Sequence, residues 1–545
     1  MMPNRSSPPP VRIVFSWMVL CVLLPCLPGG CSPAGAPRFH LRPEVERPPA
    51  AVVLISVDGF AVDRFEAFLE AGDLPNIRRV LVDGGVRVRR AVAAQPTITY
   101  ASFTTILTGR YPGSHGVVGN KWFDRYALVH RNYATIATYR WVGNDYTAPT
   151  LFEHLAPRRT VNIQNANRRG ASRTVDNWMS SGVFWFFGAF ESVDALIPRR
   201  LEEVAESANK WGDWPVFIHA YMPAVDERGH QHGADSPEYR RAAMNVDRQV
   251  GRLVAGIEAA GMLERTFFVL ISDHGHVPTA PAQYFNLAEH LRGMGMAVGE
   301  RPFVSGSFEE RKRHFETRDA VVIEGGDRRA IIHLPGPGGW HERPRYETVA
   351  ELVDPRRADG GSLWTNGTVK LIMAPRRWAD GHRTVEVYSR SGHSRLSRRQ
   401  AGAERWYGYE VVTTDALNGA VPPGERDAES WLALTVDRPL PDFVVPMFEL
   451  FESPRAGDIM LVAEKGWQFI QGRRGGHGGV DPGDVLVPMV FAGPGLPAGA
   501  SIDQARLVDV APTILGLLGI NGESSPRGTF DGVDRSAELR AARPR

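Results

Sequence analysis

Six short apolar runs rich in Val, Ile and Phe recur along this chain, and they constrain its fold more than any other feature. The first run, "AVVLISVDGF" (Ala51–Phe60), stops at Asp-Gly, as a buried strand of a parallel sheet does when it ends in a turn. Amphipathic stretches such as Glu238–Gly261 separate several of the runs. Strands that alternate with helices predict an α/β fold around a mostly parallel central sheet. The other five runs are Arg159–Ala166, Pro215–Met222, Arg265–Gly275, Gly457–Glu464 and Val485–Gly493.

Acidic residues and histidines follow the ends of these predicted strands. In an open α/β sheet the site lies outside the carboxyl ends of the strands, so these side chains should meet there. Carboxylate and imidazole groups are ligands of Zn²⁺ and similar divalent ions, and six of them suit two ions that each keep an open position. Paired metals can hold the attacking and leaving oxygens of a displacement at phosphorus. The six residues are Asp58, Asp226, His230, Asp273, His274 and His477.

Other histidines compete for the same role. His232 and His276 stand close in sequence to the predicted ligands, and His393 lies far from them. Spacing alone leaves all three open as alternatives.

The stretch "QPTITYASFTTILTGRYPGSHGVVGN" (Gln95–Asn120) predicts a short helix that ends at Gly109 and has Thr99 at its N-cap. A helix N-terminus presents free N–H groups and the positive end of the helix dipole, which together favour a bound phosphate. A threonine hydroxyl is a poor nucleophile unless a base or a metal activates it. The turn after the helix would bring Asn120 back to Thr99.

Five motifs occur in a fixed order: "ISVDGF", the Thr99 stretch, "DERGH", "SDHG" and "GGHGG". Together they resemble the type I phosphodiesterase/nucleotide pyrophosphatase family of the alkaline phosphatase superfamily, over roughly Ala51–Gly275 and Gly466–Ile520. The resemblance implies an alkaline-phosphatase-like core, with a mostly parallel central sheet flanked by helices. It also implies a hydrolase of phosphodiesters or nucleotide pyrophosphates, with two divalent metal ions, zinc above all, and a phospho-threonine intermediate.

The resemblance assigns roles to individual residues. Thr99 would attack phosphorus and bridge substrate and metal, and Asn120 would contact a non-bridging phosphate oxygen. The two implied zinc sites are Asp226, His230 and His477 for one ion, and Asp58, Asp273 and His274, with Thr99, for the other.

The family's motifs leave a long internal segment unmatched, and this defines the predicted domains. The core would span residues 51–276 and 466–530, with an α+β insertion or cap at 277–465 and a tail at 531–545. Within the insertion, "AVVIEG" and "TVEVYS" read as strands. Its basic cluster is either a solvated surface or an anion site; the cluster consists of Arg390, Arg395, Arg398 and Arg399.

Residues beside Thr99 and Asn120 suggest how substrate would be held. Tyr100, Trp122 and Phe123 would stack on a base or lipid headgroup, or would serve in packing. Lys121 would suit the carboxylate of a phosphonate substrate, which keeps a phosphonate hydrolase of the phosphonoacetate type as an alternative.

Other classes of function make different demands on the sequence. A phosphomonoesterase needs a cationic clamp, for which Arg168 and Arg169 are candidates. A non-catalytic binding lipoprotein would not need the nucleophile and all six ligands. The net charge of +2 provides no field for a nucleic-acid polymer, so the expected substrate is a small phosphate ester.

The N-terminus predicts export. Residues 1–31 read as a signal peptide of the lipoprotein type, in which "LPGGC" would make Cys31 the lipidated membrane anchor. Cleavage after Ala36 is the alternative. Residues 32–50 are rich in proline and read as a tether. The three cysteines all lie within the first 31 residues, so no internal disulfide is expected in the mature chain. The predicted location is the periplasm or cell envelope of a bacterium.

Overall fold

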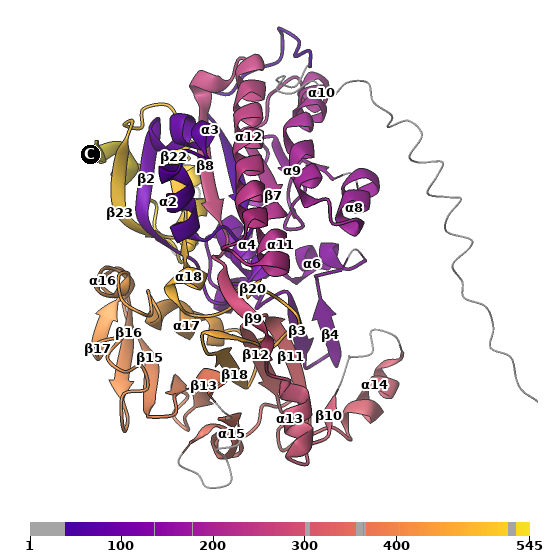
Figure 1. The fold of residues 1–545 in the computed structure, drawn as a ribbon, viewed down its shortest axis with the longest axis vertical. Coiled ribbons are helices and arrows are strands. Elements are labelled where there is room, and N and C mark those ends of the chain that lie inside the picture. The colour runs from indigo at the N-terminus through magenta and orange to yellow at the C-terminus, as the bar shows by residue number, and fades with distance from the viewer. Residues whose placement is uncertain are drawn as a thin grey trace, which may run out of the picture.

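Ten strands form the central sheet of the computed structural model, and parallel strands make up its middle (Figure 1). β1 pairs in parallel with both β7 and β8, whereas β22 pairs antiparallel to β8. In spatial order the strands are β24 (Arg543–Pro544), β23 (Ala500–Arg506), β2 (Gly85–Val92), β22 (Met489–Ala492), β8 (Thr266–Ser272), β1 (Ala51–Val57), β7 (Phe217–Met222), β5 (Thr160–Ile163) and β6 (Arg173–Val175), with β21 (Leu486–Val487) on β2. The mostly parallel sheet confirms the predicted fold class.

The structure describes residues 39–135, 137–176, 178–299, 306–355, 363–364, 367–402, 404–520 and 530–544. The predicted signal peptide, with Cys31, lies outside these residues. Within them, no helix combines the length and the apolar character that crossing a membrane requires.

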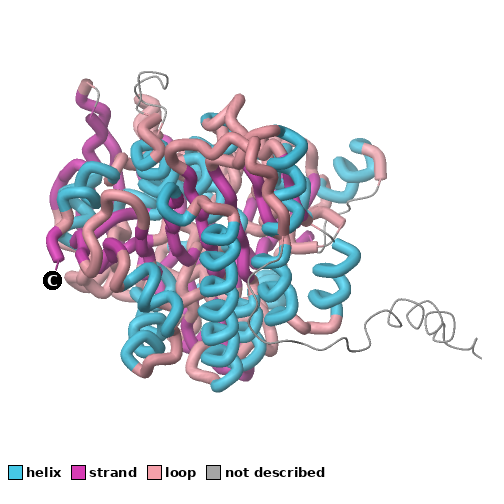
Figure 2. The backbone as a smooth tube through the Cα atoms, turned by 90° about the horizontal axis from the view of Figure 1, so that it is seen from above, coloured by secondary structure: helices cyan, strands magenta, loops and turns pink. Residues whose placement is uncertain are grey.

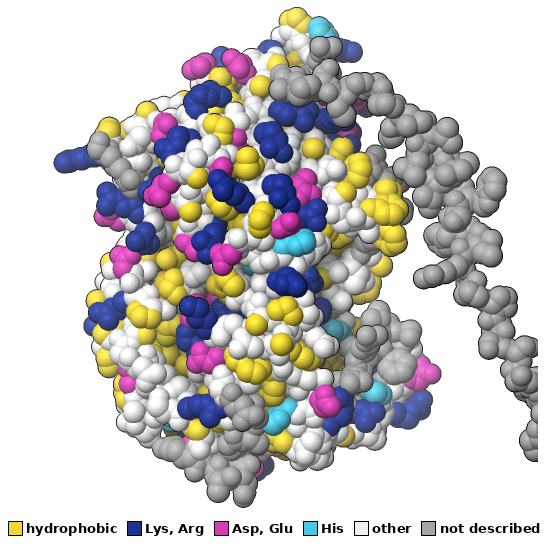
Figure 3. Space-filling model, viewed as in Figure 1, with side chains coloured by type: hydrophobic (Ala, Val, Ile, Leu, Met, Phe, Trp, Pro, Cys, Tyr) yellow, Lys and Arg dark blue, Asp and Glu magenta, His cyan; other side chains and the backbone are white. Residues whose placement is uncertain are grey.

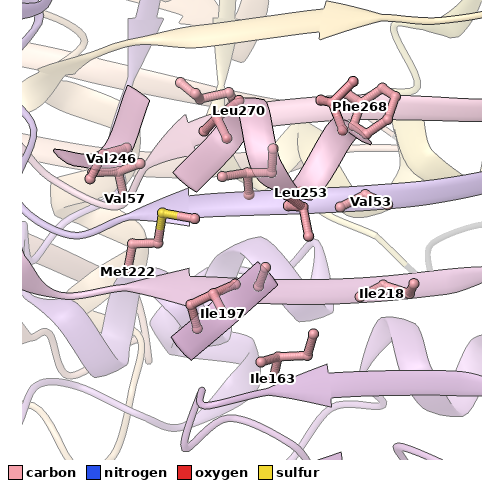
Figure 4. Close-up of a cluster of buried hydrophobic side chains, with 14 of the residues drawn as sticks. Val53, Val57, Ile163, Ile197, Ile218, Met222, Val246, Leu253, Phe268 and Leu270 are labelled. Atoms are coloured by element: carbon pink, nitrogen blue, oxygen red, sulfur yellow. The ribbon is translucent and has the colours of Figure 1, made fainter. Parts of the chain in front are cut away.

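Helices cover both faces of the central sheet because successive side chains of a strand point to opposite sides (Figure 2). Val53 and Val57 face one helical layer, where they meet Val246 and Leu253 of α12 (Figure 4). That layer contains α2 (Val62–Glu70), α3 (Pro75–Ile77), α9 (Phe190–Arg199), α10 (Leu201–Trp211), α11 (Ala224–His232) and α12 (Pro237–Ala259). The opposite layer contains α4 (Thr99–Thr108), α7 (Leu151–His154), α19 (Val510–Leu517) and α20 (Ser536–Ala541).

A second sheet of nine strands is built almost entirely from antiparallel pairs. Its strands, in spatial order, are β10 (Val298–Gly299), β11 (Ala320–Gly326), β12 (Arg329–His333), β18 (Ile459–Ala463), β13 (Val369–Arg377), β14 (Arg383–Tyr388), β15 (His393–Ala401), β16 (Glu404–Val411) and β17 (Gly424–Asp427). The helices that pack beside it include α13 (Leu287–Gly293), α14 (Phe308–Phe315), α15 (Tyr346–Val353), α16 (Ala428–Thr435) and α17 (Val444–Phe451). The two strands predicted in the inserted segment are found here, as β11 and β14. The predicted limits of the insertion remain a prediction.

Two small sheets lie between the large ones (Figure 1). One joins β9 (Val277–Tyr284) to β19 (Gly466–Gln468) and β20 (Gly475–Gly476), so it ties the two ends of the inserted segment together. The other is the hairpin of β3 (Lys121–Asp124) and β4 (Val129–Asn132), and β3 contacts β11 of the second sheet.

Two sequence-based expectations about local structure are wrong. The run at Gly457–Glu464 forms β18 of the second sheet rather than a strand of the central sheet, because its neighbours β12 and β13 come from the inserted segment. The predicted tether is not free over its second half. Val45 is buried in the core, and the backbone of Glu46 bonds to Gly212 and Trp214 at 2.8 Å.

Hydrophobic side chains gather on the surface where α8 (Trp178–Phe186) ends (Figure 3), and the exposed ones there include aromatic residues. Phe186 is 78% exposed and Phe187 is 65% exposed, and Trp185 beside them is 38% exposed.

Candidate metal centre and nucleophile

The six predicted ligands come together as two groups of three. Within each group, one ligand atom from each residue lies within 4.8 Å of the others, and all six side chains are buried. Asp58 follows β1, and Asp273 and His274 follow β8, so adjacent parallel strands deliver the first group. The second group is Asp226, His230 and His477.

In the first group, His274 faces both carboxylates. Its Nε2 lies 3.4 Å from Asp58 Oδ1 and 3.3 Å from Asp273 Oδ2. Its Nδ1 lies 3.0 Å from the carbonyl oxygen of Gly275, an arrangement that places the proton on Nδ1. Nε2 is then free to act as an electron-pair donor.

In the second group, Asp226 and His230 stand four residues apart on α11, which puts them on one helix face. His230 Nε2 lies 3.1 Å from Asp226 Oδ2. His477 comes from the glycine-rich loop after β20, and its Nδ1 lies 2.8 Å from the carbonyl oxygen of Thr97. The rings of His477 and His274 stack with centroids 3.7 Å apart, so the two groups adjoin.

The electrostatics of the two groups differ. Burial raises the pKa of Asp58 well above its usual value, and the charges of Asp273 and Asp226 raise it further. Burial raises the pKa of Asp226 as well, but three histidines, of which His230 has the largest effect, together more than offset this and hold that pKa well below its usual value. Burial lowers the pKa of His274 to about 4, so this ring is neutral near pH 7. Burial raises the pKa of Asp273 well above its usual value too, so the folded chain penalises the charged forms of both carboxyls, and a bound cation would favour their ionisation.

The residues fit divalent cations. Asp58 Oδ1 and Asp273 Oδ2 are buried and have no hydrogen-bond partner within the described part of the chain. A buried carboxylate oxygen without a partner is costly, and a cation would remove that cost. Oxygen and imidazole donors at each group match the ligands that Zn²⁺ takes.

Thr99 stands beside the first group. Its Oγ1 lies 3.2 Å from His274 Nε2. The structure begins α4 at Thr99 and makes Ile98 the N-cap, so the predicted capping position is wrong by one residue. As a consequence the hydroxyl does not cap the helix, and it faces the ligands instead. The predicted end of the helix at Gly109, where φ is 61°, is confirmed.

Asn120 is fixed to the same helix end. Its Oδ1 accepts a hydrogen bond of 2.9 Å from the backbone N–H of Tyr100, the residue after Thr99. This bond uses the amide oxygen and leaves Nδ2 as the donor. Thr99, Tyr100, Asn120 and Lys121 are all half-buried.

The two aromatic residues that follow Lys121 lie in a packed core. Trp122 is 3% exposed, and its Nε1 donates to the hydroxyl of Tyr133 at 2.7 Å. Phe123 is 1% exposed and packs edge-on against Trp340. Of the two roles that the sequence left open, this burial favours packing over substrate stacking for both. Tyr100 packs on the ring of Tyr133 and keeps part of its surface accessible.

The competing histidines take other positions. His232 is exposed at the end of α11. His393 lies in the second sheet, where it pairs with Glu386 at 2.6 Å. His276 is buried with its Nδ1 3.2 Å from Asp226 Oδ1, so it supports a predicted ligand.

Three of the four arginines of the basic cluster are neutralised locally, and the fourth, Arg390, donates to the carbonyl oxygen of Trp364. Arg395 pairs with Glu386, Arg398 with Glu449 and Glu452, and Arg399 with Glu425. These ion pairs favour the surface interpretation over an anion site.

Sequence reasoning missed two residues that contact the ligands. Tyr221 on β7 donates its hydroxyl hydrogen bond to Asp58 Oδ2. Asp327, in the turn between β11 and β12, has its Oδ2 2.9 Å from His230 Nδ1. Tyr221 lies near the end of the predicted strand Pro215–Met222, shortly before Asp226. That position could have identified it as a residue close to the site. Asp327 lies in the inserted segment, far in sequence from every motif. Nothing in the surrounding sequence indicates that it contacts the site.

The central sheet and the two ligand groups define an α/β protein with an alkaline-phosphatase-like core. A model of the type I phosphodiesterase/nucleotide pyrophosphatase family matches residues 52–484, and the chain belongs to this family.

Individual relatives agree with this placement. The chain is 30% identical over 236 residues to an uncharacterized pyrophosphatase/phosphodiesterase of Schizosaccharomyces pombe, which covers 42% of this chain and 46% of that protein. It is 27% identical over 262 residues to ectonucleotide pyrophosphatase/phosphodiesterase family member 1 of Mus musculus. That alignment covers 46% of this chain and 26% of the mouse protein. The chain thus spans less than half the length of these relatives.

A solved structure shares the fold. Murine ectonucleotide pyrophosphatase/phosphodiesterase 5 superposes with a TM-score of 0.55 at 15% identity, over 90% of this chain and 99% of that one.

Proposed function

We propose that this protein hydrolyses phosphodiesters or nucleotide pyrophosphates, with Thr99 as nucleophile and a phospho-threonine intermediate. The observation that carries the proposal is the position of Thr99 Oγ1, 3.2 Å from His274 Nε2, at the N-terminus of α4 and beside two buried ligand groups. Family membership supports the same class of reaction.

The proposed centre holds two divalent ions, zinc above all. One ion takes Asp58, Asp273, His274 and Thr99, and the other takes the remaining three ligands, Asp226, His230 and His477. When bound, such ions polarise a phosphoryl oxygen and lower the pKa of a coordinated hydroxyl or water.

The chain's own groups then have defined tasks. Thr99 Oγ1 forms the new bond to phosphorus while the bond from phosphorus to the leaving oxygen breaks, and the leaving group departs with that oxygen. Water then breaks the bond between Thr99 and phosphorus and releases a phosphate monoester that carries the remaining substituent. The N–H of Tyr100 already donates to Asn120 Oδ1, so the other N–H groups at the start of α4 and the Nδ2 of Asn120 are the proposed donors to the non-bridging oxygens.

We propose a diester rather than a monoester as substrate because the two arginines that could clamp a phosphomonoester already bind other groups. Arg169 donates to Glu153 at 3.0 Å and to the carbonyl oxygen of Ala148 at 2.6 Å, and Arg168 pairs with Asp176. Both candidate clamps are therefore engaged elsewhere. A phosphonate hydrolase is the second candidate, because Lys121 lies next to Asn120 and is half-buried.

The test compares three chromogenic substrates, namely a phosphodiester, a phosphomonoester and a phosphonate, with Zn²⁺ added to the purified mature chain. The diester should be hydrolysed fastest, and Thr99→Ala should abolish turnover. Thr108→Ala is the matched control, since the hydroxyl of Thr108 only bonds back to the carbonyl oxygen of Thr104 within α4. Intact esters in the presence of two bound metals per chain would refute the proposal.

We also propose that the protein is exported and anchored to the cell envelope through Cys31. The apolar run and the three cysteines of the first 31 residues support this. Replacement of Cys31 by Ser should release the protein from the membrane fraction of expressing bacteria, and retention there would contradict the proposed anchor.

A further inference from the structure

The turn between β11 and β12 reaches from the second sheet into the ligand groups. Asp327 in this turn is 3% exposed, and its Oδ2 lies 2.9 Å from Nδ1 of His230. The other ring nitrogen of His230 lies 3.1 Å from Asp226. Asp327 therefore stands behind the ligand, on the side of the ring away from Asp226.

The Asp327 carboxylate has no competing task among the described residues. Its Oδ2 is buried and makes no hydrogen bond that satisfies normal angles, and the nearest cation, Arg473, is 3.8 Å from its Oδ1. The carbonyl oxygen of Gly475, at 3.2 Å, is the other acceptor in reach of His230 Nδ1. A buried carboxylate in this position is costly unless it pairs with the ring.

The backbone holds Asp327 firmly against the loop of His477. Its carbonyl oxygen accepts a hydrogen bond of 2.6 Å from Phe469 N–H, and the N–H of Arg328 donates to the carbonyl oxygen of His477 at 3.0 Å. A Cβ on Gly476 would lie 2.5 Å from Asp327 Cβ, so only glycine permits this approach. The glycines beside His477 thus serve the contact with the second sheet.

We propose that Asp327 is a positioning residue of the metal centre, and the proposal rests on the function proposed above. Together with the carbonyl oxygen of Gly475, its carboxylate keeps the proton of His230 on Nδ1, which leaves Nε2 for the ion, and it adds one negative charge behind the ligand. Histidine ligands are commonly oriented in this way, and loss of the partner typically weakens metal affinity about 10–100-fold.

The inference gives the second sheet a role in the chemistry. Since Asp327 comes from between β11 and β12, the metal centre is complete only when the inserted segment is docked on the core. The inserted segment therefore contributes a residue to the metal centre, whether or not it also covers the active site.

The experiment measures Zn²⁺ affinity of the full chain by competition with a chromophoric chelator, which needs no substrate. Asp327→Asn should weaken one of two sites about 10–100-fold and leave the other unchanged. His230→Ala identifies the affected site. Asp319→Asn is the matched control, since this exposed carboxylate of the same segment only accepts a hydrogen bond from Ala297 N–H. Binding of Co²⁺ should show an altered visible spectrum in Asp327→Asn alone.

The outcomes separate this inference from the proposed function. Unchanged affinity at both sites in Asp327→Asn would overturn the inference and leave the function standing. Equal weakening of both sites would also overturn it, because Asp327 would then support the fold rather than His230. A wild-type chain that binds no metal would overturn the function and the inference together. Circular dichroism checks folding, and Asp327→Ser, which also removes the charge and should weaken the same site, replaces the Asn variant if that variant does not fold.

Discussion

Replacement of Asn120 by Asp and, separately, by Ala tests the phosphate-binding role of its amide. The hydrogen bond of 2.9 Å from Tyr100 N–H to Asn120 Oδ1 fixes one end of this side chain. Asn120→Asp keeps that acceptor and replaces the Nδ2 donor with a negatively charged oxygen. Asn120→Ala removes both the acceptor and the donor.

The two possible roles of Asn120 predict opposite rankings of kcat for the Asp and Ala variants. Loss of one donor to a developing negative charge costs about 2.7–4 kcal/mol, or about 10²–10³ in kcat. A carboxylate about 4 Å from an anionic phosphate oxygen adds repulsion of about 4 kcal/mol at an effective dielectric constant of about 20. If the amide holds phosphate, Asn120→Asp should therefore be slower than Asn120→Ala. If Asn120 only fixes the backbone at Tyr100, the Asp variant should be the faster one.

The assay is hydrolysis of a chromogenic phosphodiester at saturating Zn²⁺, with kcat and KM measured separately. Thermal unfolding of both variants controls for loss of the Tyr100 contact. An Ala variant within threefold of the wild type, or an Asp variant faster than the Ala variant, would refute the reasoning.

Four further outcomes are expected. Thr99→Ser should retain measurable diester hydrolysis because it keeps the hydroxyl, and turnover as low as that of an Ala variant would contradict this. Removal of metal by a chelator should lower the melting temperature, since ligand at about 1,000 times its Kd adds about 4 kcal/mol of stability; an unchanged melting temperature would count against the metal centre. Burial lowers the pKa of His115 and of His219 to about 3, so below pH 6.5 the unfolded chain binds protons that the folded chain does not. The free energy of unfolding should then fall by about 1.4 kcal/mol per pH unit for each histidine as the pH drops from 6.5 toward 3, as urea titrations would show; a flat profile would refute it. Asp442→Ala should lower the free energy of unfolding, measured in urea, by about 3–5 kcal/mol, because it removes the carboxylate that pairs with the buried Arg506 at 2.6 and 2.9 Å. A loss below about 1 kcal/mol would contradict this prediction.

Much of the catalytic core could be predicted because its information is local. A run such as Ala51–Val57 is apolar at every position except Ser56, which marks a strand buried on both faces. The topology rule for parallel sheets then places the residue after each strand at one edge. Asp58, Asp273 and His274 follow that rule, and Asp226 and His230 follow it through the spacing on α11.

The second sheet resisted prediction for the opposite reason. The apolar run of β18 looks the same as that of a core strand, and only its pairing with β12 and β13 assigns it to another sheet. Strand pairing is decided by contacts between residues far apart in sequence. The sequence of a short apolar run does not indicate which strand it will pair with.

By itself, the sequence determined the fold class, the family and the meeting of the six predicted ligands near Thr99. Strand hydrophobicity, helix periodicity and motif order are local properties, and each can be read one segment at a time. The tertiary structure alone decided that Asp327 stands behind His230, that Trp122 and Phe123 are packed away, and that Thr99 faces the ligands instead of capping its helix. These outcomes depend on which surfaces meet when distant segments pack, because burial and hydrogen-bond partners exist only once the chain has folded.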